Sequence, residues 1–189
     1  MDRPHALNVL ISLFDISAGQ SPTSSVLTAV DARGNTIYPI IARVRVAPAH
    51  QATPPAPTAL LGDFAGLISS RLDALPQVAG STTLSVTLQL AALKSTPIDA
   101  KVFMHVIDSA GKVIAQSDHQ PDAGWFPTNY WQKGDVINDH FEIVLPAGIQ
   151  VNSLKLGFGM YAGQTAQRLT AVDAVTGAHA QDDMLFVQH

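Results

Sequence analysis

The chain has 189 residues, enough for one sizeable domain, and 47% hydrophobic against 14% charged residues favours a packed globular protein over disorder. The formal net charge of −4 leaves no basic field to gather phosphates and no polybasic segment for anionic lipid, so we expect no nucleic-acid partner. The absence of cysteine excludes disulfides, thiolate nucleophiles and cysteine metal ligands.

The first predicted elements are short β-strands. Residues 7–14 alternate apolar and polar side chains, which predicts a strand with one buried face. This apolar stretch is too short for a membrane span of roughly 20 residues, so we expect no direct membrane insertion of the chain. Further strands are predicted at 26–30 and 40–46, with a turn at Asp31–Gly34 between them.

Two segments follow that are less regular. Residues 48–57 contain four prolines and cannot supply a continuous ladder of N–H donors, which predicts a linker or a long extended crossing. Residues 58–75 place apolar side chains at helical spacing, but Gly62 and Gly66 weaken a helix. Propensity alone leaves strand and helix both open for this segment.

The rest of the chain reads as strands. Period-two alternation recurs at 84–90, 141–145 and 154–161, while 102–107 is apolar on both faces apart from His105, which suits a central strand. The turn at Asp108–Gly111 suits a hairpin. The fold class predicted is therefore all-β, an antiparallel two-sheet sandwich of the jelly-roll or immunoglobulin-like kind, with no long helix.

An internal repeat links the two ends of the chain. The five residues 28–32 recur identically at 170–174, 142 residues further on, and an alternating strand ending in an aromatic residue precedes each copy. These strands end at Phe14 and Tyr161, which are 147 residues apart, so the intervening loops differ by five residues. We predict that 1–47 are the terminal strands of a truncated first repeat, able to pack on the second, that 48–57 are a Pro-rich linker, and that 58–189 form a complete β-sandwich module.

A series of short motifs between residues 60 and 174 follows the order and spacing of a known family. They are Leu61-Gly62, Leu67–Asp73, Val102–Asp108, Gly111, Ala115–Asp118, Pro121, Gly124, Pro127-Thr128, Trp131, Gly134-Asp135, Asp139, Leu145-Pro146, Gly159–Tyr161 and Arg168-Leu169. In these the chain resembles the extracytoplasmic C-terminal β-sandwich module of bacterial membrane glycosyltransferases, which are themselves similar to dolichyl-phosphate-mannose–protein mannosyltransferases. The tract Gly148–Ser153 departs from that family's Pro-Gly-Tyr approach to the last strands.

The resemblance implies a strand for residues 58–75, an extracytoplasmic location in the cell envelope, and a parent membrane domain as partner. It supplies no established catalytic residue. On this basis we expect a non-catalytic domain that scaffolds or docks a membrane glycosyltransferase-like protein.

The best binding candidate in the sequence is an aromatic cluster. Trp125, Phe126, Tyr130 and Trp131 fall within seven residues, although aromatics are only 6% of the chain. Flat sugar faces stack on exposed rings, which makes a carbohydrate-binding module the alternative function. Trp131 is expected to plug the sandwich, and the candidate glycan-binding side chains are Trp125, Tyr130, Asp122, Asn129 and Gln132.

Catalytic and metal chemistry find little support in the residues. The seven histidines show no metal-ligand spacing, and His105 is expected to be a hydrogen-bonded core residue. Asp118, Asp122 and Asp139 leave a bound calcium open without specifying it. The glycine string 157–162 matches a dinucleotide fingerprint but lies within a predicted strand, where the glycines more simply allow close packing. We therefore predict no enzyme, no cofactor and no catalytic residue.

Edge strands left without partners can pair with other chains. The truncated first repeat is therefore expected to favour self-association.

Overall fold

The computed structural model describes residues 3–10, 13–14, 26–27, 29–30, 32–34, 36, 40–47, 53–74, 82–149 and 151–187. The chain forms two compact units, a larger one of residues 1–4 and 47–189 and a smaller one of residues 5–46. The larger unit contains the strands β5 Ala59–Leu61, β6 Ala65–Ala74, β7 Thr83–Ala92, β8 Ala100–Ile107, β9 Val113–His119, β10 Val136–Val144, β11 Lys155–Ala162, β12 Ala171–Asp173 and β13 Leu185–Phe186.

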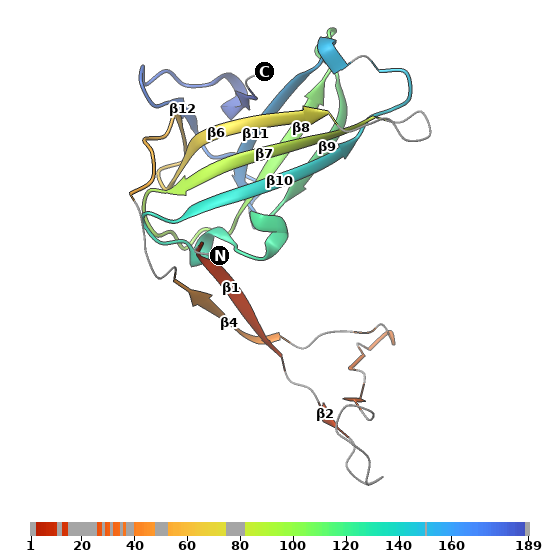
Figure 1. Cartoon of the computed structure of the whole chain (residues 1–189), viewed down its shortest axis with the longest axis vertical. Helices are drawn as coiled ribbons and strands as arrows, with labels where there is room; N and C mark the ends of the chain where they lie inside the picture. Colours follow the sequence, from red (N-terminus) through yellow and green to blue (C-terminus); the bar gives the residue numbers. More distant parts are fainter. Residues whose placement is uncertain are drawn as a thin grey trace. The chain divides into compact units, whose positions relative to one another are not determined.

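The larger unit is an antiparallel β-sandwich, which confirms the predicted fold class. One sheet has five strands in the order β10-β7-β6-β5-β12, and the other has four in the order β13-β11-β8-β9. Figure 1 shows β6, β7 and β10 side by side in one layer, with β8, β9 and β11 in the layer behind. The helices described in this unit are single 3₁₀ turns: η2 Asp122–Gly124, η3 Thr128–Tyr130, η4 Val151–Ser153 and η5 Gln181–Asp183.

The core follows from period-two alternation on strands of both sheets. In β7 and β10 every second side chain is buried, and the register pairs buried with buried, as in Val86 opposite Phe141. The central strand β8 contributes Val102 and Met104, both fully buried. Burying each such side chain stabilises the fold by about 1.5–3 kcal/mol.

The described part of the segment 58–75 forms the hairpin of β5 and β6, as the family resemblance implied. The chain turns at Gly62, whose φ of +60° suits glycine, and β6 then carries a bulge between Leu67 and Ser69. The turn and the bulge each break the period of two. The apparent helical spacing of apolar residues in the sequence therefore comes from two irregularities in a strand pair.

The hairpin between β8 and β9 forms at the predicted turn. Oδ1 of Asp108 accepts hydrogen bonds from the backbone N–H groups of Ala110 and Lys112, both at 2.9 Å, and Gly111 adopts a φ of +82°. This turn fixes the register of β8 against β9.

The smaller unit contains short antiparallel pairs. β1 His5–Leu10 pairs with β4 Ile40–Val46, and β2 Leu13–Phe14 pairs with β3 Val26–Leu27. The strands predicted at 7–14, 26–30 and 40–46 thus correspond to strands in the described residues, with β3 shorter than predicted. The predicted Pro-rich linker is described only from residue 53, and there it carries no strand.

None of the helices in the described residues has the length and apolar character that a membrane span requires.

Candidate functional site

The aromatic loop of residues 121–132 is held to the sandwich by buried side chains. Phe126 and Trp131 are each 1% exposed, and Nε1 of Trp131 donates a hydrogen bond to the carbonyl oxygen of Phe126 at 2.9 Å. Thr128 is fully buried; its hydroxyl donates to the carbonyl of Ile98 at 2.6 Å and accepts from the N–H of Ala100 at 2.8 Å. These contacts make Trp131 the structural plug that the sequence predicts.

A buried carboxylate anchors the start of the same loop. Asp139 is fully buried, and its Oδ1 accepts the backbone N–H of Asp122 at 2.9 Å and lies 2.9 Å from Nε2 of His119. The His119 ring packs on Phe141, with centroids 4.1 Å apart. The loop is therefore fixed at its beginning, middle and end.

The five predicted glycan-binding residues all lie within this aromatic loop. Trp125 is 61% exposed, Asn129 and Gln132 are also exposed, and Asp122 and Tyr130 are half-buried. The two cavities described below are lined by other residues. The loop thus offers an exposed indole on a backbone that is held to the sandwich.

The described residues do not gather a metal site. Oδ2 of Asp139 is buried without a hydrogen-bond partner in the described part of the chain. Even so, no three His, Asp or Glu side chains among those residues come close enough together to hold an ion. The three carboxylates considered for calcium in the sequence therefore do not form such a group.

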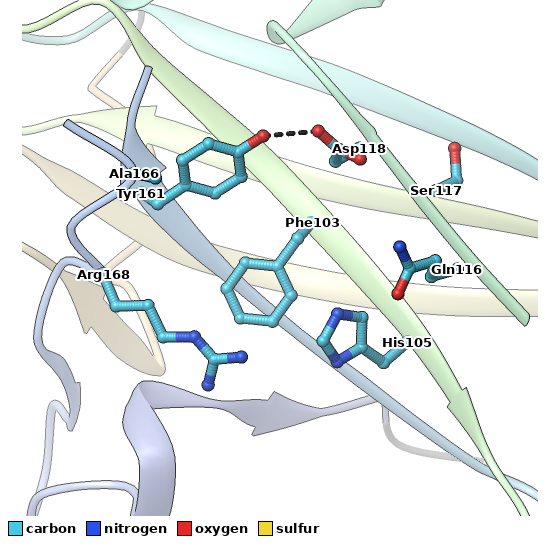
Figure 2. A pocket seen from close by; sticks show the side chains of 8 residues that line it. All are labelled: Phe103, His105, Gln116, Ser117, Asp118, Tyr161, Ala166 and Arg168. Carbon is cyan, nitrogen blue, oxygen red and sulfur yellow. Dashed lines mark hydrogen bonds between the residues drawn. The ribbon is translucent and has the colours of Figure 1, made fainter. Parts of the chain in front are cut away.

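A different surface combines rings with charged groups. On the outer face of β8, β9 and β11 lies a cavity of about 230 Å³, here named the β8–β11 hollow. Figure 2 shows the side chains that line it: Phe103, His105, Gln116, Ser117, Asp118, Tyr161, Ala166 and Arg168. A larger cavity of about 470 Å³ lies at the edges of β5, β6 and β13, but Asp173 is the sole charged residue among those lining it.

Strand register brings the side chains of the hollow together. β8 pairs with β9 so that Phe103 lies opposite Asp118 and His105 opposite Gln116. On its other edge β8 pairs antiparallel with β11, which supplies Tyr161, and an isolated bridge joins Tyr161 to Arg168. The period of two places these residues on the face of the sheet that points away from the core.

Opposite charges are arranged around the aromatic floor. The Tyr161 hydroxyl donates a hydrogen bond to Oδ2 of Asp118, and Nζ of Lys101 lies 4.0 Å from the same oxygen. The Arg168 guanidinium carbon lies 4.7 Å from the centre of the Phe103 ring, and Nη1 donates to the carbonyl of Asp182 at 2.5 Å. Figure 2 shows the guanidinium directed toward this ring. Stacking and hydrogen bonding together hold the guanidinium in place.

His105 is not the core residue that the sequence suggests. Its ring is half-buried on the outer face, 4.9 Å from the Phe103 ring, and it lines the hollow. Burial lowers the pKa of His105, and the positive charge of Arg168 lowers it further, partly opposed by Asp118. His105 is therefore uncharged at neutral pH and can both donate and accept a hydrogen bond.

The Tyr161 hydroxyl is expected to ionise late. Burial, and then the hydrogen bond to Asp118, raise its pKa from 10.0 to about 12. Because the pKa is raised in the folded state, the stability linked to this group is fully present below pH 10 and is lost as pH rises through about 12. In an ultraviolet titration, Tyr161→Phe should remove an ionisation centred at about pH 12. Loss of an earlier transition would contradict this assignment.

Glycine in β11 lets the floor of the hollow form. A Cβ added at Gly159 would lie 2.6 Å from the carbonyl oxygen of Asp183 and 2.7 Å from the Phe103 ring. The Phe103 ring lies across the strand because this position has no side chain. The glycines of the fingerprint-like string therefore serve close packing within a strand, as the sequence favours.

Gly159→Ala is expected to destabilise the sandwich by about 1–3 kcal/mol, because backbone and ring must both shift to admit the methyl group. Gly157→Ala is the matched control, since its added methyl meets the side chain of Met184, which can move. Chemical denaturation of both variants measures the difference. Equal stability losses in the two would contradict the packing argument.

Sequence reasoning missed this site because it treated β8 as covered on both faces. The signal was present in His105 and Tyr161, whose half-buried rings lie on a face that no further layer of the described sandwich covers, above the buried ring of Phe103. Arg168 was noted only as part of a family-like motif, and Asp118 only there and among the carboxylates considered for calcium.

The hollow lacks the pair of acids that most glycoside hydrolases use. Asp118 is the sole carboxylate among its eight lining residues. Ser117 lines it as well, but no hydrogen bond between that serine and His105 is recorded in the described part of the chain. The arrangement is suited to holding a ligand.

No protein-family model matches the chain, and no curated protein matches it in sequence. Among solved structures, a beta-glucuronidase from glycoside hydrolase family 2 is similar over 55% of this chain, with 10% sequence identity and a TM-score of 0.41. The matched part spans 11% of that enzyme's chain. Nothing about function follows from a likeness of this size.

Proposed function

We propose that this chain is a non-catalytic carbohydrate-binding domain and that the β8–β11 hollow is its glycan site. The observation that supports the proposal is the joining, in one open cavity, of an aromatic floor with a carboxylate, a guanidinium and an amide. A sugar ring presents both an apolar face of C–H groups and a rim of hydroxyls. Such a ligand needs rings and polar groups side by side.

The geometry provides for both kinds of contact. Phe103 and Tyr161 have ring centroids 6.5 Å apart. The Phe103 ring is 4% exposed and forms the base of an apolar strip, so the half-buried rings of Tyr161 and His105 are the ones that a sugar can reach. Asp118 and Arg168 lie on opposite sides of that strip in Figure 2, each already held by a hydrogen bond. Charged groups form stronger hydrogen bonds to ligand hydroxyls than neutral ones do, and prepositioned groups lose little freedom on binding.

The family resemblance supports a setting for this activity. We place the domain outside the cytoplasm as part of a membrane glycosyltransferase-like protein, where a glycan site would hold acceptor or product near the membrane domain. Docking to that membrane domain is the second candidate function. The exposed indole of Trp125 on its pinned loop favours it, because a fixed aromatic side chain is a common anchor in protein contacts.

A glycan array followed by titration calorimetry tests the proposal. Because a shallow site buries little area, we expect affinities of about 0.1–1 mM for the best ligand. Arg168→Ala should weaken binding by about tenfold or more, which corresponds to roughly 1.4 kcal/mol.

Trp125→Ala is the control and should leave binding unchanged. If Trp125→Ala abolishes binding while Arg168→Ala does not, the aromatic loop is the glycan site. If the wild-type protein binds no glycan, the proposal is wrong.

A further inference from the structure

The strand pairings of the smaller unit recur in the larger one. Residues up to Phe14 correspond to residues 147 further on, and those from Val26 to Val30 to residues 142 further on, as in the sequence repeat. Three antiparallel pairings of the smaller unit have counterparts in the larger one at or close to these offsets. The pairing of β1 with β4 corresponds to that of β11 with β13. The pairing of Phe14 with Val26 corresponds to that of Tyr161 with Arg168, and the pairing of Val30 with Thr36 to that of Val172 with His179. The smaller unit therefore has the connectivity of the last third of a sandwich.

The two counterpart strands differ in what covers them. β11 pairs on both edges, with β8 and with β13. Among the described residues, β1 pairs on one edge, with β4. The edge of β1 that corresponds to the β8 side of β11 thus has no strand beside it in the described part of the chain.

The same comparison holds for side-chain burial. Leu154 and Leu156 of the larger unit are 5% and 1% exposed. Their counterparts Leu7 and Val9 are 53% and 38% exposed, and Val44, which pairs with Leu7, is 50% exposed. An apolar face that the complete sandwich buries is therefore accessible in the smaller unit.

Charge distinguishes the two strands of this pair. β4 carries Arg43 and Arg45, and charged residues on a strand discourage pairing with further strands. β1 contains no Asp, Glu, Lys or Arg. Two β1 strands can therefore lie side by side without bringing like charges opposite each other.

We propose that β1 pairs antiparallel with β1 of a second copy of this chain, so that two smaller units form one four-stranded sheet around a two-fold axis. Such an interface is self-complementary, as two-fold symmetry requires. In the larger unit the inward residue Leu156 pairs with the inward residue Val106. The same rule sets the register here: Leu7 lies opposite Leu7 or Val9 of the second copy, since a slip of one residue would place apolar side chains on both faces.

Concentration-dependent light scattering of the whole chain is the first test. A six-residue strand pair is small for an interface, so we expect a dissociation constant of about 10–100 μM. Leu7→Lys and Val9→Lys should weaken the dimer at least about tenfold, since each brings charge to the shared face. Both side chains are substantially exposed, so the melting of the larger unit should not change.

Val175→Lys is the matched control, because Val175 is 87% exposed on the larger unit and should leave the dimer intact. The chain has no cysteine, so single replacements Leu7→Cys or Val9→Cys, or a mixture of the two, should form an intermolecular disulfide much faster than Val175→Cys does.

A wild-type chain that stays monomeric to about 1 mM would overturn the proposal and leave the face to a different partner. Dimers that the lysine variants do not weaken would overturn it as well, by placing the interface elsewhere.

Discussion

Trp131→Ala is expected to lower the free energy of unfolding by about 3–5 kcal/mol, the usual range for truncating a buried aromatic side chain. The indole is 1% exposed and fills the space between the aromatic loop and the sandwich. Its Nε1 hydrogen bond to the Phe126 carbonyl is lost in the same step, which leaves a buried oxygen without its donor. Chemical denaturation followed by circular dichroism measures the change.

Trp125→Ala provides the comparison. The two tryptophans lie six positions apart on one loop, but Trp125 is 61% exposed and its loss should change stability by less than about 0.5 kcal/mol. A large loss of stability in Trp125→Ala would show that this ring belongs to the core in solution. A small loss in Trp131→Ala would show that the loop packs less tightly than its contacts indicate.

Thr128→Val is expected to lower the free energy of unfolding by about 2–4 kcal/mol, because one hydroxyl satisfies two backbone groups. It accepts the N–H of Ala100 and donates to the carbonyl of Ile98, at the start of β8. Valine keeps the volume but leaves both groups unpaired. Their desolvation without a hydrogen bond is the source of the expected loss.

Thr128→Ser separates the hydroxyl from the methyl group. Serine keeps both hydrogen bonds and loses one buried methyl, for which we expect a cost of about 1 kcal/mol. If serine proves as damaging as valine, packing of the methyl dominates and the hydrogen bonds are not the main tie between loop and sheet.

The strands of the sandwich could be predicted because their burial alternates. Leu84, Val86 and Leu88 are fully buried in β7, as their spacing indicates, and the Asp108 turn forms with the hydrogen bonds expected of an aspartate at that position. These features depend on neighbours in sequence and on one buried face. Local patterns carry that information.

The hairpin β5–β6 could not be assigned from its residues alone. Its apolar side chains Leu61, Phe64 and Leu67 are all buried, but they flank a tight turn at a spacing of three, and a bulge after Leu67 breaks the period of two again. A bulge depends on what the partner strand requires, here β7. The periodicity of one segment carries no information about how that segment pairs with another strand.

For the candidate site, the sequence shows the individual residues but not that the fold brings them together. Phe103 and His105 alternate with core residues in β8, but whether their face meets solvent or another layer depends on the whole arrangement of sheets. The contact of Arg168 with Phe103 joins positions 65 residues apart in sequence. The aromatic loop stood out in the sequence because its rings are close together, and two of its four rings, Phe126 and Trp131, proved to be buried.

The loop between Tyr161 and Arg168 borders the hollow through Ala166, and its length differs between the two copies of the repeat. In the first copy the corresponding segment, from Phe14 to Val26, is five residues longer, while the same antiparallel pair closes both loops. Roughly doubling a flexible loop costs only about 0.6 kcal/mol in closure entropy. This rim is therefore a place where insertions can accumulate over evolutionary time, or be grafted in the laboratory, to alter ligand choice while the strands beneath stay unchanged.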